Sequence, residues 1–171
     1  MELNFKGRVA IVTGGGAGMG KAAILEFARS GAAVVIADVS EENMKQTAAE
    51  VKKLGARALA IKCDITNNAD IKNVVDKTLA EFGRIDILFN YAGGNPGGKK
   101  MELFIEETEE YWDKMIAINL KGTMMFCRAV METMMKQRYG KIINTAAIAG
   151  KIGSPRMVAY STVKGGIIAF T

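Results

Sequence analysis

Residues 8–20, with the sequence RVAIVTGGGAGMG, decide the fold. Residues 8–13 form a short run rich in β-branched residues, typical of a strand buried on both faces of a parallel sheet. Five glycines follow between positions 14 and 20, and a helical pattern begins at about residue 18. A strand that enters a helix through a glycine-rich turn predicts a nucleotide-binding βαβ unit.

The turn itself has the composition of a phosphate-binding loop. Glycines let the backbone approach a pyrophosphate closely, and the free N–H groups and dipole of a helix N-terminus attract negative charge. We therefore predict that Thr13, Gly14, Gly18, Met19 and Gly20 bind a dinucleotide.

Apolar runs and amphipathic segments alternate along the rest of the chain. The predicted further strands are 33–38, 57–62, 84–90 and 140–149, and the predicted helices are 18–30, 41–54, 67–82, 108–138 and 158–171. This alternation predicts right-handed crossovers and a doubly wound parallel α/β sheet, the Rossmann fold, with strand order 3-2-1-4-5. We expect one dinucleotide-binding domain over residues 1–171.

Two segments depart from the alternation. Residues 91–107 are rich in glycine and contain Pro96, which predicts a loop over the ligand crevice. The last helix stops at Thr171 in mid-pattern, without a glycine cap or a charged final turn. We therefore expect a domain truncated in the helix after strand five, with the later strands missing.

Composition limits the function classes. Apolar residues make up 49% and charged residues 24% of the chain, as in a globular domain. The formal charge of +5 comes from scattered lysines and arginines, so no nucleic-acid partner is predicted. No apolar run reaches the roughly 18 residues of a membrane helix, and the start MELNFKGR is unlike a signal peptide, so we expect a cytoplasmic protein without membrane association.

The chain has two cysteines, Cys63 and Cys127, and no histidine. These cysteines lack the spacing of a disulfide scaffold or a zinc site, so no metal site is predicted. Because histidine is absent, acid–base chemistry has to use tyrosine, lysine, a carboxylate or a thiol.

Asp38 ends the second predicted strand, about 20 residues after the glycine turn. A carboxylate there accepts hydrogen bonds from both hydroxyls of the adenosine ribose and repels a 2′-phosphate. No lysine or arginine lies in the glycine turn or directly after Asp38 to attract that phosphate. The pattern therefore favours NAD over NADP as the cofactor.

Tyr160 and Lys164 lie four residues apart on the last predicted helix, so their side chains share one face. Tyrosine has an ordinary pKa of about 10, too high for a base at neutral pH. An adjacent lysine cation and a bound nicotinamide cation stabilise the phenolate. We therefore predict that the two residues form an acid–base pair and also contact the cofactor.

These motifs resemble those of the short-chain dehydrogenase/reductase family over the whole chain. Thr13, Gly14, Gly18 and Gly20 match the family's Thr-Gly-x-x-x-Gly-x-Gly turn, and residues 160–164 match its Tyr-x-x-x-Lys motif. The resemblance implies a nicotinamide-dependent oxidoreductase that acts on a small alcohol or ketone and forms a dimer or tetramer.

The resemblance assigns further residues. Cys63-Asp64-Ile65 is similar to the family's adenine-contacting segment, which implies cofactor contacts from Asp64 and Ile65. Asn119 corresponds to a helix asparagine that holds a water in a proton relay to Lys164.

Asn90-Tyr91-Ala92-Gly93 is similar to the family's Asn-Asn-Ala-Gly segment after strand four. The match implies that Asn90, Ala92 and Gly93 line the cofactor. Tyr91 departs from the family pattern.

One residue of the family pattern is missing. The family places a serine thirteen residues before the tyrosine, where it hydrogen-bonds and orients the substrate oxygen, and this position is Ala147. Thr145 shares a strand face with Ala147 but lies further back, and Ser154 and Ser161 do not occupy the matching position. Loss of one such donor costs on the order of 10²–10³ in turnover.

Three explanations of Ala147 stay open: an engineered trap for a bound substrate, a natural variant compensated from elsewhere, and a protein that binds dinucleotide without catalysis. The predicted function is hydride transfer between NAD and a secondary alcohol or its ketone, with Tyr160 taking the hydroxyl proton. Lys164 would lower the pKa of Tyr160 and bind ribose. The alternative is a catalytically decayed dinucleotide-binding or scaffolding protein.

The resemblance also suggests where subunits would meet, because family members associate through the long helices after strands four and five. Met124, Met125, Phe126 and Met131 lie on the first of these helices. In a monomer the same residues would be core.

Overall fold

The computed structural model describes residues 3–96 and 102–171. At its centre is a parallel sheet with strand order β3-β2-β1-β4-β5. The strands are β1 (Val9–Thr13), β2 (Ala33–Asp38), β3 (Ala58–Lys62), β4 (Ile87–Asn90) and β5 (Lys141–Asn144). The predicted doubly wound fold and strand order are confirmed.

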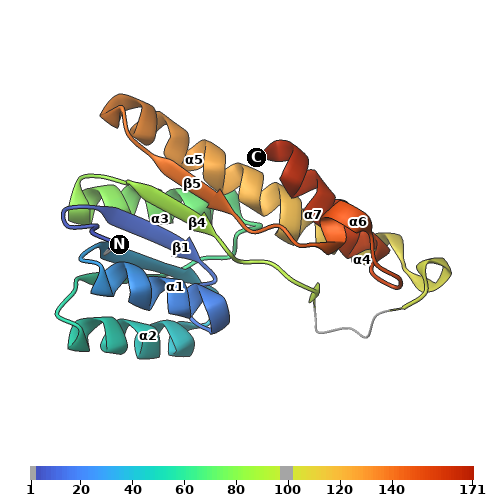
Figure 1. Cartoon of the computed structure of the whole chain (residues 1–171), viewed down its shortest axis with the longest axis horizontal. Helices are drawn as coiled ribbons and strands as arrows, with labels where there is room; N and C mark the ends of the chain where they lie inside the picture. Colours follow the sequence, from blue (N-terminus) through green and yellow to red (C-terminus); the bar gives the residue numbers. More distant parts are fainter. Residues whose placement is uncertain (1–2, 97–101) are drawn as a thin grey trace.

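Helices cover both faces of the sheet (Figure 1). One face carries α1 (Gly18–Arg29) and α2 (Glu41–Lys53), and the other carries α3 (Asn68–Phe82) and α5 (Gly122–Gln137). Successive side chains of a strand point to opposite faces. Accordingly Val12 packs in the core beneath α1 and α2, whereas Ile11 packs in the core beneath α3 and α5.

The segment predicted as one long helix, 108–138, is helical but not uniform. It consists of α4 (Glu109–Ile116), the π-helical turn η3 (Ala117–Lys121) and α5. Single π-helical turns inside α-helices are frequent at functional sites. This turn contains Asn119, one of the predicted catalytic residues.

The last part of the chain lies beside the carboxyl end of β5 (Figure 1). It contains α6 (Ala149–Ile152) and α7 (Val158–Phe170), which pack against each other, and α7 also contacts α4. The predicted loop 91–107 contains a short 3-10 helix, η2 (Phe104–Glu106), and its residues 97–101 lie outside the described residues.

Strand five is shorter than predicted. The interpretation of 140–149 as a strand is wrong beyond Asn144, because β5 pairs only with β4, which ends opposite Asn144 at Asn90. The N–H of Thr145 still donates to the carbonyl of Asn90 at 3.1 Å, but beyond it the chain has no further strand to pair with and turns into α6. Strand four similarly begins at Ile87 instead of 84.

The four residues predicted at a subunit interface differ in how deeply they are buried. Phe126 is completely buried in the core and Met125 packs against that core, so Phe126 is not an interface residue. Met124 and Met131 are 43% and 49% exposed on the outer side of α5. In the described part of the chain, no helix is both long and apolar enough to cross a bilayer.

Candidate active site

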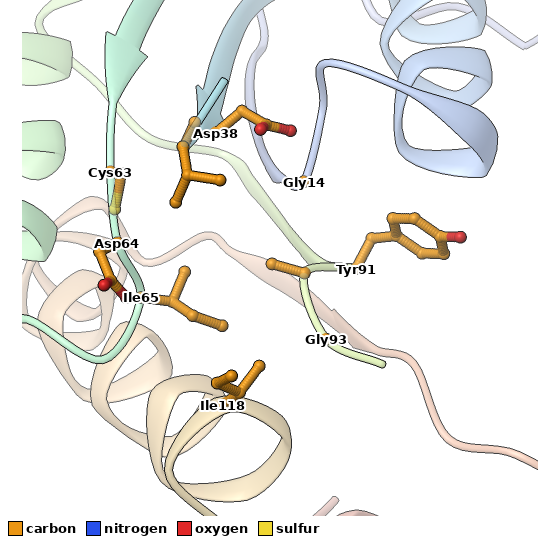
Figure 2. Close-up of a pocket in the computed structure, with 11 residues that line it drawn as sticks. Gly14, Asp38, Cys63, Asp64, Ile65, Tyr91, Gly93 and Ile118 are labelled. Carbon is orange, nitrogen blue, oxygen red and sulfur yellow. The ribbon is translucent and has the colours of Figure 1, made fainter. Parts of the chain in front are cut away.

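A cavity of about 370 Å³ opens at the carboxyl end of the sheet, where the strand order reverses between β1 and β4 (Figure 2). This crevice is where ligands bind in doubly wound sheets. The residues that line it are Gly14, Ala37, Asp38, Val39, Cys63, Asp64, Ile65, Tyr91, Ala92, Gly93 and Ile118. Residues predicted from four separate segments of the sequence therefore meet at one cavity.

The glycine turn forms one wall. Gly14 has a left-handed φ of 66°, and a Cβ at Gly20 would lie 2.1 Å from the carbonyl oxygen of Gly14, so both positions require glycine. The N-cap of α1, Ala17, offers no side chain to the first N–H groups of the helix. These groups remain available to an anion such as a pyrophosphate.

Asp38 is held rigidly at the end of β2. Its Oδ2 accepts a hydrogen bond from the N–H of Gly16 at 2.9 Å, and its Oδ1 accepts one from the N–H of Ser40 at 3.0 Å. The carboxylate is therefore fixed between the glycine turn and the start of α2. Its charge lies where the predicted ribose hydroxyls would bind and where a 2′-phosphate would be repelled.

Opposite the glycine turn, the cavity has an apolar wall. Ile65 and Ile118 point into it from β3's end and from η3 (Figure 2). Asp64 lies beside them, and its Oδ1 accepts hydrogen bonds from the N–H and the hydroxyl of Thr66 at 2.9 and 2.8 Å. This wall provides an apolar surface for a flat ring, with a carboxylate at its margin.

Thr13 and Asn90, both predicted to bind the cofactor, support the site from beneath. The Thr13 hydroxyl accepts hydrogen bonds from the N–H groups of Tyr91 and Ala92, each at 3.0 Å. The amide of Asn90 donates to Oδ1 of Asn144 at 3.0 Å and to a buried thiol. Both residues are buried and neither lines the cavity: Thr13 positions the turn after β4, whereas Asn90 links the end of β4 to β5.

Two further predicted residues, Met19 and Gly18, lie at the start of α1 outside the cavity lining. Met19 is 65% exposed. The cavity also contains residues that sequence reasoning did not assign, namely Ala37, Val39, Cys63, Tyr91 and Ile118. Each is next to an assigned residue in the chain, so proximity in sequence was the one signal that could have found them.

The thiol of Cys63 has low reactivity. Burial, together with the carboxylates of Asp70, Asp64 and Asp38, raises the pKa of its thiol to about 12. A thiol with so high a pKa stays protonated at neutral pH and is a poor nucleophile. Within residues 3–96 and 102–171, no group of three acidic, cysteine or histidine side chains could hold a metal ion.

Lys164 lies buried on α7 with 5% of its surface exposed. Its Nζ donates to the carbonyl oxygen of Thr145 at 2.9 Å and lies 5.7 Å from the centroid of the Tyr160 ring. Burial lowers the pKa of Lys164 below its usual value. The two residues thus share one face of the helix, as their spacing predicts.

Asn119 contacts the loop that follows β4, next to the Tyr160–Lys164 pair. Its Oδ1 accepts from the N–H of Gly94 and its Nδ2 donates to the carbonyl of Gly94, both at 2.8 Å. A Cβ at Gly93 would lie 2.8 Å from Oδ1 of Asn119 and 3.7 Å from Nζ of Lys164. Gly93, which lines the cavity, therefore lies next to both Asn119 and Lys164, and the Asn119 amide binds the backbone of the loop.

Ala147 lies between β5 and α6 instead of in a strand, so the sequence argument that Thr145 shares its strand face does not hold. Within the described residues, the hydroxyls of Thr145 and Ser161 are buried without a hydrogen-bond partner. Thr145 lies next to Lys164, whose Nζ contacts its carbonyl oxygen, and Ser161 follows Tyr160 on α7.

Comparison with known proteins identifies the family of this protein. Residues 8–171 match the model of the short chain dehydrogenase family, and the chain belongs to that family. The strand order and the glycine turn described above agree with this membership.

Individual relatives are similar over nearly the whole chain. An uncharacterized oxidoreductase of Thermotoga maritima is 42% identical over 99% of the chain, and a 3-oxoacyl-(acyl-carrier-protein) reductase of the same organism is 36% identical over 99%. A crystal structure of NAD+-bound xylitol dehydrogenase superposes with a TM-score of 0.93 at 36% identity over 98% of the chain. The chain spans 65%, 67% and 63% of these three proteins, respectively.

Proposed function

We propose that this protein transfers a hydride between NAD(H) and a secondary alcohol or its ketone. The observation that carries the proposal is the placement of Lys164, whose Nζ would lie 3.7 Å from a Cβ at Gly93, beside the dinucleotide cavity. Tyr160 lies next to it on α7. The similarity to a 3-oxoacyl reductase and to a xylitol dehydrogenase agrees with ketone and alcohol chemistry.

The residues of the cavity fit a dinucleotide. Its diphosphate would bind at the uncapped N-terminus of α1, its adenosine ribose at Asp38, and its adenine against Ile65 and Ile118 beside Asp64. When bound, the nicotinamide supplies the hydride acceptor or donor. The similarity to an NAD+-bound dehydrogenase supports NAD, and the fixed charge of Asp38 disfavours NADP.

The protein's own residues would move the proton. In the oxidation direction the Tyr160 phenolate takes the proton of the substrate hydroxyl, and in reduction the phenol returns it. Lys164, whose Nζ lies 5.7 Å from the centroid of the Tyr160 ring, would place a positive charge beside the residue that exchanges the proton. Asn119 holds the backbone of Gly94 next to Gly93, which lines the cavity and whose Cβ position lies 3.7 Å from Nζ of Lys164.

Ala147 favours a second candidate function, a dinucleotide-binding protein without turnover. With alanine at this position, the family's substrate-orienting hydroxyl is missing, and a missing donor costs on the order of 10²–10³ in turnover. Cofactor binding does not involve that hydroxyl. The two candidates therefore agree on dinucleotide binding and differ only in catalysis.

Turnover of Tyr160→Phe tests the first candidate. We expect NADH titration by fluorescence to give the same affinity as the wild type, and oxidation of a panel of secondary alcohols to fall below detection. Tyr139→Phe is the matched control, because Tyr139 lies beside Arg8 at the other end of the sheet. Full activity in Tyr160→Phe would refute the acid–base assignment, and absence of NADH binding in the wild type would refute the cofactor assignment.

We also propose that the protein forms a homo-oligomer and that it is located in the cytoplasm. A homo-oligomer would form through the exposed side of α5, where Met124 and Met131 border an apolar hollow of about 530 Å³ together with Phe170. The cytoplasmic location predicted from the sequence is a proposal of the same kind, which fractionation of producing cells would test.

A further inference from the structure

Tyr91 occupies the position where the family pattern has a second asparagine, and its aromatic ring enters the glycine turn. Its Cδ1 lies 2.9 Å from the position of a Cβ at Gly20 and 3.4 Å from that of a Cβ at Gly14. The ring also packs against Phe89, with 6.1 Å between the ring centroids. Tyr91 is therefore in close contact with both glycines that shape the turn.

The Tyr91 ring points away from the apolar wall of the cavity (Figure 2). From the base of the cavity, the phenol runs toward the start of α1 and away from the apolar wall formed by Ile65 and Ile118 (Figure 2). Its hydroxyl oxygen lies 3.9 Å from the position of a Cβ at Gly18, the first residue of α1. The hydroxyl is thus on the side of the cavity where the helix N-terminus lies, and on the opposite side from the adenine wall.

The hydroxyl has the properties of a binding group. Among the residues that the structure describes, it has no hydrogen-bond partner. The first N–H groups of α1 beside it likewise lack a side-chain cap. One phenolic donor and several backbone donors therefore lie together at one end of the cavity.

We propose that Tyr91 is a further cofactor-binding residue, whose hydroxyl donates a hydrogen bond to the diphosphate of the bound dinucleotide. This inference rests on the proposed function. An ionised phosphate oxygen makes the hydrogen bond charge-assisted, and such bonds are about twice as strong as neutral ones. The side chain of an asparagine at this position is several bonds shorter than that of tyrosine. Its amide would therefore not extend to Gly18 as the Tyr91 hydroxyl does.

Tyr91→Phe tests the hydroxyl while it keeps the ring that packs against Gly14 and Gly20. We expect affinity for NADH and for ADP to fall on the order of tenfold, because the variant loses a charge-assisted hydrogen bond to a phosphate oxygen. Affinity for adenosine, which lacks phosphate, should stay unchanged. Calorimetric titration with these three probes measures the effect, and thermal denaturation checks that the variant folds.

Tyr139→Phe is the matched control, because it removes the same group far from the cavity, and it should bind all three probes as the wild type does. If wild-type protein binds NADH and Tyr91→Phe binds it equally well, the inference is overturned and the proposed function stands. If Tyr91→Phe weakens adenosine as much as ADP, the residue acts on the shape of the turn and the diphosphate contact is refuted. If the wild type binds neither NADH nor ADP, the proposed function fails and the inference fails with it.

Discussion

At the scale of single residues, Ala147 lies between β5 and α6, at the position where the family pattern has a serine. We expect Ala147→Ser to raise turnover of secondary alcohols on the order of 10²–10³, since one oxygen-stabilising donor is restored. NADH affinity should not change, because Ala147 does not line the dinucleotide cavity. Steady-state kinetics and fluorescence titration measure the two effects separately.

The neighbouring Ala146→Ser is the matched control for this change, since Ala146 is exposed in the same segment and should give no gain. An Ala147→Ser variant that binds NADH and shows no gain in turnover would support the catalytically decayed alternative. Equal gains in both variants would mean that position 147 has no special role.

Under the proposed function, the charge of Asp38 would favour NAD over NADP. Asp38→Asn keeps the size of the side chain and removes the charge that repels a 2′-phosphate. We expect the preference for NADH over NADPH to fall on the order of tenfold, measured as the ratio of the two dissociation constants. Asp64→Asn removes a carboxylate from the opposite wall and serves as control, and an equal fall in that variant would contradict the assignment to Asp38.

At the scale of elements, the close crossing of α6 and α7 holds the Tyr160–Lys164 pair. A Cβ at Gly150 would lie 2.5 Å from the backbone carbon of Lys164 and 2.6 Å from the backbone nitrogen of Gly165. Because both contacts are to backbone, Gly150→Ala has to push the helices apart. We expect a loss of about 1–3 kcal/mol in the free energy of unfolding, with a fall in turnover.

Chemical denaturation measures this loss, and Ile152→Ala in the same short helix is the control. Ile152 is 75% exposed, so its truncation should change stability by less than about 0.5 kcal/mol. A Gly150→Ala variant as stable as the wild type would show that the crossing is looser than its geometry indicates.

A buried carboxylate joins β1 and β4 at their amino ends. Asp86 is fully buried, and it accepts hydrogen bonds from Arg8, from Arg84 and from the N–H of Val9 at 2.7 to 3.0 Å. Burial alone would raise the pKa of Asp86, but the hydrogen bonds from Arg84, Val9 and Arg8 together lower it below its usual value of 3.8.

The lowered pKa of Asp86 determines how the stability of the fold depends on pH. The stabilisation from Asp86 is fully present above pH 3.8 and is lost as pH falls through the lower pKa of the folded state. We expect Asp86→Asn to cost about 2 kcal/mol at neutral pH, because the partner guanidiniums are partly exposed and screened. The difference from the wild type should shrink in strong acid, and denaturation curves at several pH values would contradict this if the difference stayed constant.

At the scale of the whole molecule, the outer side of α5 is the surface predicted to join subunits. Met131 is 49% exposed there, beside the hollow that Met124 and Phe170 border. If this side is buried between two copies, Met131→Lys places a charge in an apolar contact and should shift the protein toward monomers of 18.4 kDa. Light scattering after gel filtration measures the mass.

Leu54→Lys provides the control for that experiment, since Leu54 is 43% exposed at the end of α2, on the other face of the sheet. It should leave the mass unchanged. A wild-type protein that is monomeric at micromolar concentration would refute the predicted oligomer, whatever the variants do.

The sequence by itself determined the order of strands and helices and most of the residues around the cavity. The alternation of apolar runs with helical patterns is local information, and it predicted the doubly wound sheet that β1 to β5 form. The glycine turn and Asp38 were also found, because the backbone of a strand-turn-helix unit and a strand-end carboxylate depend on residues close together in the chain.

Only the tertiary structure decided which elements end early and which side chains meet. The extent of β5 depends on where β4 stops beside it, which no pattern within 140–149 contains. Likewise Thr13 supports the turn at Tyr91, and Gly93 lies next to both Asn119 and Lys164, through contacts between residues far apart in the chain. Local periodicity fixes an element, whereas burial and hydrogen-bond partners arise only when separate elements pack together.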